Sequence, residues 1–226
     1  MKVNDYFGSK PDEISIEVMR YADGVTVCEM VLNEEHDLKL FRGGELLHSF
    51  VCSPSELGEL CAGWLYTEGY SAESVTVSED GHTATADAVE GNPADAGCLE
   101  LTETVSASTE EMLALFNRAS DKYSRSHGIH ECVLKGNGWD ILRTDIGRHN
   151  AIDKAVGTAL LKGYDLKGAV MFSSGRINEQ TVRKAVRCGI SCLMSKAVIT
   201  RQALHLAEEL GLKVFFSVKN DSYMTK

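Results

Sequence analysis

The spacing of apolar residues divides the chain into a front part of short β-like runs and a back part in which strands and helices alternate. Residues 1–15 are polar and are expected to form a terminal tail. Residues 14–31 show the short apolar spacing of strands, and residues 38–51 contain two apolar runs around a glycine pair, which is typical of a β-hairpin. Residues 73–108 are again β-prone, so the front part is expected to be mostly strand.

One helix is expected within this front part. Ser53 is a suitable N-cap, Pro54 fits the first helical position, and Glu56 would complete a capping box. Apolar side chains three and four positions apart form its expected buried face, at Leu57, Leu60, Cys61, Trp64 and Leu65. Gly69 is expected to end the helix.

The last hundred residues alternate regularly between strand and helix patterns. Residues 131–134 and 140–143 are expected to be strands joined by a Gly136-Asn137-Gly138 turn, which is a strong β-hairpin signal. Further strands are expected at residues 169–173, 190–194 and 212–218. The expected helices are residues 149–161, 179–187 and 200–210. This order, with glycine after each helix, predicts a parallel sheet with helices packed on it.

The fold class is therefore expected to be α/β, built in two parts. Residues 1–108 would form a smaller N-terminal α/β region and residues 109–226 a second domain. The turn-like segment 90–98 is a candidate linker or loop between them.

The formal net charge of −10 is unevenly distributed. Residues 1–133 carry 8 Lys and Arg against 25 Asp and Glu, whereas residues 134–226 carry 15 against 8. An acidic front half argues against a nucleic-acid-binding protein. The basic back half suits a small anionic ligand, although two differently charged solvated surfaces would give the same pattern.

The chain has neither an apolar run of the ~18 residues that a membrane span needs nor an apolar N-terminal signal core. We therefore expect a cytoplasmic protein without membrane contact. The seven cysteines are scattered and odd in number, so they are expected to be mostly small buried side chains, with at most one reactive thiol.

Two loops follow expected strands, at the position where open α/β sheets bind ligands. One reads Ser173-Ser174-Gly175-Arg176 and the other covers residues 195–197, Ser-Lys-Ala. Hydroxyls, a glycine and an arginine at a helix start can hold an anion, although an ordinary tight turn has the same composition. The spacing is not that of a P-loop.

The densest polar segment, residues 143–154, lies between a strand and an amphipathic helix. A solvated helix start would explain Asp145 and Asn150 as caps, but it does not require Arg148 beside His149, so a ligand site is favoured here. The segment from His127 to Cys132 could suggest zinc, yet no C-x-x-C pair and no zinc deaminase signature are found, so no metal is expected.

These segments resemble the motifs of a known family. Residues 145–154 read Asp-Ile-Gly-Arg-His-Asn-Ala-Ile-Asp-Lys and resemble the D-[VI]-G-R-H-N-A-x-D-K motif of the formate dehydrogenase accessory protein (FdhD) family. His-Gly-Ile-His at 127–130 is similar to its T-G-G-x-H element, with Ser126 and His127 replacing the usual Thr and Gly. Residues 53–69 and 174–185 are similar to two further family segments, so the resemblance covers roughly residues 20–225.

The resemblance implies a C-terminal cytidine deaminase-like domain and a sulfurtransferase activity. Such a protein takes persulfide sulfur from a cysteine desulfurase and passes it to the molybdenum bis-molybdopterin guanine dinucleotide cofactor of a molybdenum- or tungsten-dependent formate dehydrogenase. A guanine nucleotide would then mimic the ligand, and a homodimer is expected. The implied cofactor-binding positions, together with the anion loop, are His130, Asp145, Gly147, Arg148, His149, Asn150, Asp153, Lys154, Ser173, Ser174, Gly175 and Arg176.

The sulfur-bearing loop departs from the family pattern. The family's C-G-x-C-G loop corresponds here to Asp95-Ala96-Gly97-Cys98-Leu99, which leaves Cys98 as the candidate catalytic thiol. One thiolate is enough to carry a persulfide, but a two-cysteine relay is impossible at this site. Cys98 could instead be a bystander, in which case the chain would be a cofactor-binding chaperone or regulator. A zinc deaminase-like hydrolase is a third alternative, and the absent zinc ligands argue against it.

Overall fold

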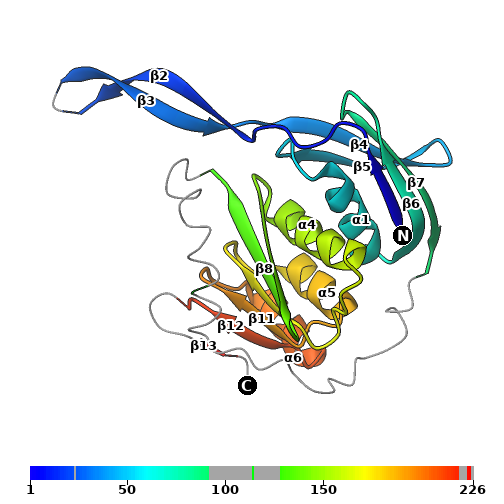
Figure 1. Ribbon diagram of the computed structural model, residues 1–226. Coiled ribbons are helices and arrows are strands. Elements are labelled where there is room, and N and C mark those ends of the chain that lie inside the picture. The colour runs from blue at the N-terminus through cyan, green and yellow to red at the C-terminus, as the bar shows by residue number, and fades with distance from the viewer. Residues whose placement is uncertain (23, 92–113, 115–127, 219–222, 225–226) are drawn as a thin grey trace.

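The computed structural model describes residues 1–22, 24–91, 114, 128–218 and 223–224, and within these it is a mixed α/β protein (Figure 1). The first part contains a five-stranded sheet in the order β1-β6-β7-β4-β5, with helix α1 packed on it. Its elements are β1 (Lys2–Asp5), β4 (His36–Arg42), β5 (Glu45–Cys52), α1 (Leu57–Thr67), β6 (Tyr70–Val77) and β7 (Thr83–Glu90). The hairpin expected in residues 38–51 is confirmed as β4 and β5. The expected N-terminal tail is wrong, because residues 2–5 pair in parallel with β6.

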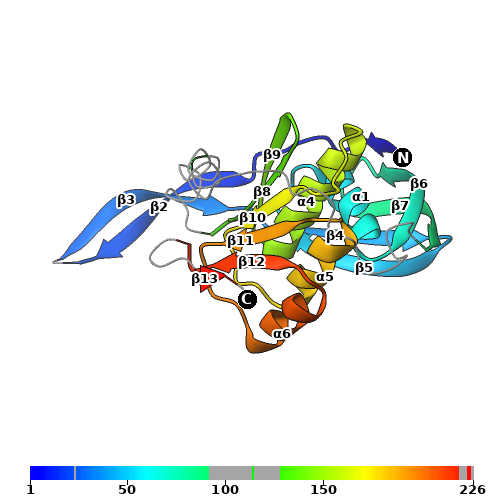
Figure 2. The same ribbon diagram turned by 90° about the horizontal axis from the view of Figure 1, so that it is seen from below.

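Strands β2 (Glu13–Tyr21) and β3 (Val25–Asn33) form a separate two-stranded sheet. This hairpin projects away from the rest of the molecule as a long arm (Figures 1 and 2). Directly opposite residues in an antiparallel pair point to the same face. One face of the arm therefore carries three successive apolar pairs, Ile14 with Leu32, Ile16 with Met30, and Val18 with Cys28.

The second part contains a six-stranded sheet in the order β13-β12-β11-β10-β8-β9. Its elements are β8 (His130–Gly136), β9 (Trp139–Asp145), α4 (Arg148–Leu161), β10 (Val170–Ser173), α5 (Glu179–Arg187), β11 (Cys192–Ser195), α6 (Arg201–Glu209), β12 (Lys213–Phe216) and β13 (Tyr223–Met224). Strands β10, β11 and β12 are parallel, as predicted. The expected hairpin of residues 131–134 and 140–143 is confirmed as β8 and β9, which pair antiparallel. Strands β8 and β13 also join the parallel strands in antiparallel pairs.

Helices α1 and α4 hold the two parts together and lie between the two larger sheets (Figure 1). Their backbones touch at two glycines. A Cβ atom on Gly63 would overlap the carbonyl oxygen of Asp153, and one on Gly157 would overlap that of Glu59. Because a larger residue cannot fit at either position, these two glycines allow α4 to pack directly against α1. The finer expectations, a cytidine deaminase-like domain and a boundary at residue 108, stay predictions, since residues 92–113 lie outside the described chain.

The start of α1 differs from the predicted capping box. The helix begins at Leu57, and Glu56 occupies the cap position in a left-handed conformation with φ 51°, without a side-chain cap hydrogen bond. Ser53 makes tertiary contacts instead: its hydroxyl accepts a hydrogen bond from the Ile146 N–H, and its own N–H donates to Asp145. The predicted buried face is confirmed, with Leu57, Leu60, Cys61 and Leu65 fully buried.

Candidate functional site

The site lies where the C-terminal end of β10 meets the start of β8. Ser174 follows β10 and binds both ways to Glu131: its N–H donates to the Glu131 carbonyl at 3.0 Å, and its hydroxyl accepts from the Glu131 N–H at 3.0 Å. The same hydroxyl lies 3.3 Å from Nδ1 of His130. The predicted anion loop and the His-Gly-Ile-His segment are therefore adjacent.

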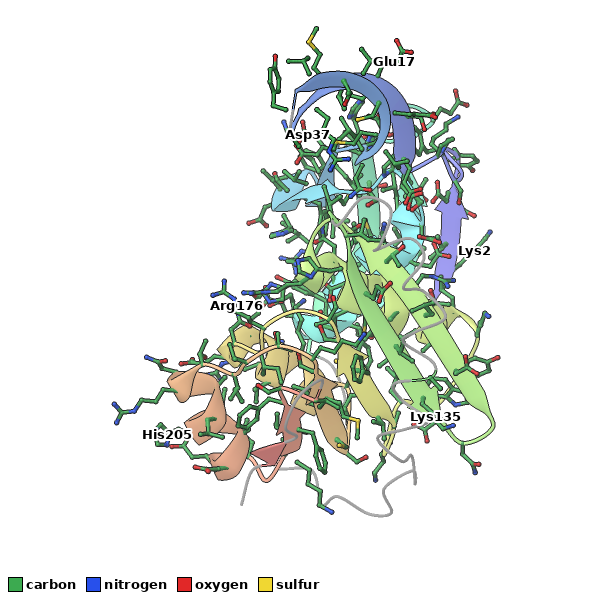
Figure 3. The ribbon with its side chains drawn as sticks, turned by 90° about the vertical axis from the view of Figure 1, so that its left-hand side faces the viewer. Lys2, Glu17, Asp37, Lys135, Arg176 and His205 are labelled. Atoms are coloured by element: carbon green, nitrogen blue, oxygen red, sulfur yellow. The ribbon has the colours of Figure 1, made fainter. Side chains whose placement is uncertain are left out.

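Gly175 brings the third motif into this group. A Cβ atom at Gly175 would lie 3.0 Å from Cβ of Arg148, the first residue of α4, and 3.5 Å from Nδ1 of His130. The absence of a side chain thus lets the arginine and the imidazole approach the same loop. Three segments distant in sequence therefore meet at this point. Figure 3 marks the position of the loop by Arg176, which is exposed at the surface.

His149 connects this group to the start of α5. Its Nε2 lies 3.3 Å from Oδ1 of Asn178 and 3.4 Å from Nε of Arg148. The same Asn178 oxygen caps α5 by accepting the Thr181 N–H. Either His149 donates to Asn178 or it accepts from Arg148, depending on which ring nitrogen carries the proton.

Arg148 carries the positive charge at the start of α4. Burial lowers the pKa of His149 to about 4, with Arg148 and Lys184 adding to the effect. Burial, and then Arg148, also lower the pKa of His130. Both imidazoles are therefore neutral at pH 7, while Arg148 forms no ion pair with any residue in the described part of the chain.

Helix α4 begins here without a side-chain cap. Its N-cap residue is Gly147, no carboxylate lies in its first turn, and Arg148 follows immediately. The first N–H groups of a helix have no partner within the helix and favour a negative charge. An uncapped helix start, a guanidinium without a described carboxylate and neutral imidazole donors can together bind a phosphate group.

Comparison with known proteins identifies the family of the chain. The model of the FdhD/NarQ family matches residues 81–225. The chain belongs to this family. The chain is 29% identical over 241 residues to the sulfur carrier protein FdhD of Bacillus pumilus, covering 91% of this chain and 92% of that protein. It is 29% identical over 194 residues to the protein FdhD of Methanocaldococcus jannaschii, covering 84% and 85% of the two chains.

The fold also matches a solved member. The crystal structure described as a formate dehydrogenase accessory protein from Desulfotalea psychrophila superimposes with a TM-score of 0.77 and 21% sequence identity. The match covers 95% of this chain and 96% of the other. At this identity the likeness establishes the fold, which extends over both parts of the FdhD chain.

Several residues of the FdhD motif face inward and support the site. Asp145 and Lys154 form a fully buried ion pair at 2.7 Å. Asp145 also accepts the N–H of Gly147 at 2.8 Å, the N–H of Ser53 at 3.1 Å and the amide of Asn150 at 2.9 Å. These bonds fix the turn before Arg148. Their geometry indicates a positioning role, and direct ligand contact by Asp145, Asn150 and Lys154 stays a prediction.

A second buried pair holds the other side of α4. Lys184 on α5 contacts both carboxylate oxygens of Asp153, at 2.8 and 3.0 Å, and Glu68 at 3.0 Å. Thr67, the last residue of α1, donates to Asp153 at 2.8 Å. Burial alone would lower the pKa of Lys184, but the charges of Asp153 and Glu68 outweigh it and raise that pKa. Asp153 therefore links α1, α4 and α5, and both of its carboxylate oxygens are bonded to other side chains of the protein.

The remaining predicted residues lie around the same strand ends. Ser173 is buried, and its hydroxyl accepts the Gly175 N–H at 3.3 Å, which shapes the loop. Ser195, at the end of β11, donates to the Gly175 carbonyl at 2.8 Å. The predicted loop of residues 195–197 is therefore hydrogen-bonded to the predicted anion loop of residues 173–176. Sequence patterns missed Ser53 and Glu131 as parts of the site, because their contacts are long-range.

The catalytic candidate Cys98 lies outside the described residues. Cys28 is partly exposed, and the other five described cysteines are buried. Burial raises the pKa of Cys52 and of Cys188 to about 12 and that of Cys192 to about 11, and it also raises those of the remaining buried thiols, Cys61 and Cys132. The expectation that most cysteines are small buried side chains is confirmed for these five, and none of them can readily supply a thiolate.

No group of three metal-binding side chains occurs among the described residues, and no helix in that part of the chain has the length and apolarity to cross a membrane.

Proposed function

We propose that this FdhD chain carries persulfide sulfur on Cys98 to a molybdenum bis-molybdopterin guanine dinucleotide bound at the site of Arg148. The observation that carries the proposal is the group formed by Arg148, Gly175 and His130 at the uncapped start of α4. It offers a guanidinium that has no ion-pair partner among the described residues, together with backbone N–H groups and neutral imidazoles, and these suit the phosphates of a dinucleotide. The cofactor is the cargo of this chain.

The proposed sulfur transfer begins with attack of the Cys98 thiolate on the outer sulfur of a cysteine desulfurase persulfide. A new S–S bond forms at Cys98, the old one breaks, and the desulfurase cysteine leaves as a thiolate. Delivery of the outer sulfur as sulfide returns Cys98 to the thiol and takes two electrons from a thiol reductant. The five buried cysteines support Cys98 as the carrier, since their raised pKa values disfavour the thiolate.

Intact-mass measurement after incubation with a cysteine desulfurase and cysteine tests the carrier role. We expect a gain of one sulfur atom that dithiothreitol removes, that disappears in Cys98→Ala and that persists in the control Cys28→Ala. If wild-type protein gains no sulfur but still binds GDP, the chain is a cofactor-binding chaperone or regulator. The single cysteine in the segment 95–99 is the observation that favours this second candidate.

The proposed partners are a cysteine desulfurase and a molybdenum- or tungsten-dependent formate dehydrogenase in the cytoplasm. The homodimer stays a prediction. The apolar face of the arm, with Ile14 43%, Met30 48% and Leu32 38% exposed, is one described surface that such an association could cover. Sedimentation velocity of the wild-type chain tests this state directly.

A further inference from the structure

Glu131 is a buried carboxylate that the proposed mechanism does not use. Its exposed fraction is 0%, and among the described residues neither carboxylate oxygen has a hydrogen-bond partner. Burial raises its pKa to about 7, against the opposing charge of Lys196. A buried carboxylate without donors is destabilising, so native proteins rarely keep one unless it serves a ligand or a reaction.

The backbone of Glu131 is held rigidly at the edge of the anion site. Its N–H and carbonyl are both bonded to Ser174, and its neighbour His130 faces the loop of Gly175. Successive side chains on a strand point to opposite faces. Glu131 therefore lies on the other face of the sheet from His130, on the side that carries Val133.

This face of the sheet is apolar. Val133, Phe172 and Met194 are buried side by side on β8, β10 and β11, because they are directly paired in register. The carboxylate of Glu131 lies at the end of this apolar surface nearest the strand ends. A nucleotide whose phosphates bind at Arg148 and whose base crosses those strand ends would meet this carboxylate, which is closed to solvent in this structure.

We propose that Glu131 recognises the guanine base of the bound ligand by accepting hydrogen bonds from its N1–H and its exocyclic amino group. The inference rests on the proposed function, since it concerns the same ligand whose phosphates Arg148 holds. An ionised carboxylate has two oxygens, each able to accept, and it matches two adjacent donors. Guanine presents such a donor pair, hypoxanthine presents only N1–H, and adenine presents an acceptor at N1.

The hydrogen-bonding state of Glu131 fits a ligand-binding role better than a purely structural role. Two neighbouring donors would satisfy both orphaned oxygens at once, which repays the desolvation of the carboxylate. A site that hydrogen-bonds a polar group discriminates strongly against an analogue that lacks it, because its own polar atoms are then left unpaired.

The test is calorimetric titration of the full chain with GDP, IDP and ADP, using wild type, Glu131→Gln and the control Glu209→Gln, an exposed carboxylate on α6. We expect wild type and the control to prefer GDP over IDP by about 10-fold and over ADP by about 100-fold. In Glu131→Gln the three affinities should converge to within about 3-fold, because phosphate binding at Arg148 remains.

Equal binding of GDP and IDP by wild type would overturn the role of Glu131 while leaving the anion site in place. Retention of the GDP preference by folded Glu131→Gln would do the same. Failure of wild type to bind any of the three would instead remove the proposed function, and this inference with it. The wild-type ratio decides the matter even if the variant folds poorly, and we expect normal folding because the variant removes an unpaired buried charge.

Discussion

Replacement of Arg148 by methionine is the sharpest perturbation of the site. Methionine keeps an unbranched apolar stem against Gly175 and removes the guanidinium, which has no described carboxylate partner. A hydrogen bond to a charged group contributes about 1.5–3 kcal/mol, so the loss should weaken GDP binding by about 10- to 150-fold. Because no ion pair within the described residues is broken, the free energy of unfolding should change by less than about 1 kcal/mol.

The same substitution has an independent electrostatic consequence. Arg148 contributes to the lowered pKa values of His130 and His149, so both should rise in Arg148→Met while staying below the ordinary value of 6.5 because of burial. The unfolded chain binds the His149 proton first, so the stability due to the neutral imidazole is lost as pH falls from 6.5 toward about 4. With the pKa raised, that acid-dependent loss should be smaller in the variant.

Calorimetry with GDP and NMR titration of the histidine ring protons measure these two effects separately. Arg183→Met is the matched control, because Arg183 is exposed on α5 and pairs only weakly with Glu179, at 3.8 Å. The control should keep the wild-type affinity and the wild-type histidine titrations. The reasoning fails if Arg148→Met shifts both histidines as expected yet binds GDP within 2-fold of wild type, since the guanidinium would then be present but unused.

Three further results are expected. Lys184→Met leaves Asp153 buried with one hydroxyl donor and should lower the free energy of unfolding in urea by about 3–5 kcal/mol. Adding Asp153→Asn to the same chain should recover part of this loss, and a double variant that recovers none of it would contradict the pairing. Gly157→Ala places a Cβ on the carbonyl oxygen of Glu59 and should lower the urea midpoint by separating α1 from α4; an unchanged midpoint would refute the backbone contact. The ratio of GDP to IDP affinity should rise with pH through about 7, because Glu131 accepts two donors only when ionised, and the ratio should be flat in Glu131→Gln.

Local patterns were sufficient for the elements but not for their long-range pairing. Helix α5 occupies the predicted residues 179–187, because an amphipathic repeat and a glycine stop determine it locally. The pairing of β1 with β6 could not be read, since a short polar strand gains its stability from its neighbour. The predicted capping box at Ser53 is wrong for a related reason. The Ser53 hydroxyl accepts a hydrogen bond from the Ile146 N–H, which lies 93 positions away in sequence, and no local pattern encodes such a bond.

The residues of the site were predictable as a group, whereas their division into ligand-facing and supporting positions was not. Residues 145–154 are contiguous in sequence, but the turn of helix α4 places Arg148 at the surface and Asp153 in the protein interior. Glu131 could not be predicted as part of the site, because an acidic residue in a strand is ordinarily solvated and its sequence does not reveal that it is buried.

The two buried ion pairs explain how a small site keeps one orientation. The pair Asp145–Lys154 fixes the turn before α4, and the pair Asp153–Lys184 fixes α4 against α1 and α5. Each pair neutralises itself, so it contributes little net charge to the site, and removal of one partner leaves an uncompensated buried charge. The field at the start of α4 therefore comes mainly from Arg148 and the helix N-terminus, and Lys184 adds to it at His149. Lys184 is buried and paired, whereas Arg148 is partly exposed and has no ion-pair partner among the described residues, which is why changes at Lys184 and Arg148 should separate stability from binding.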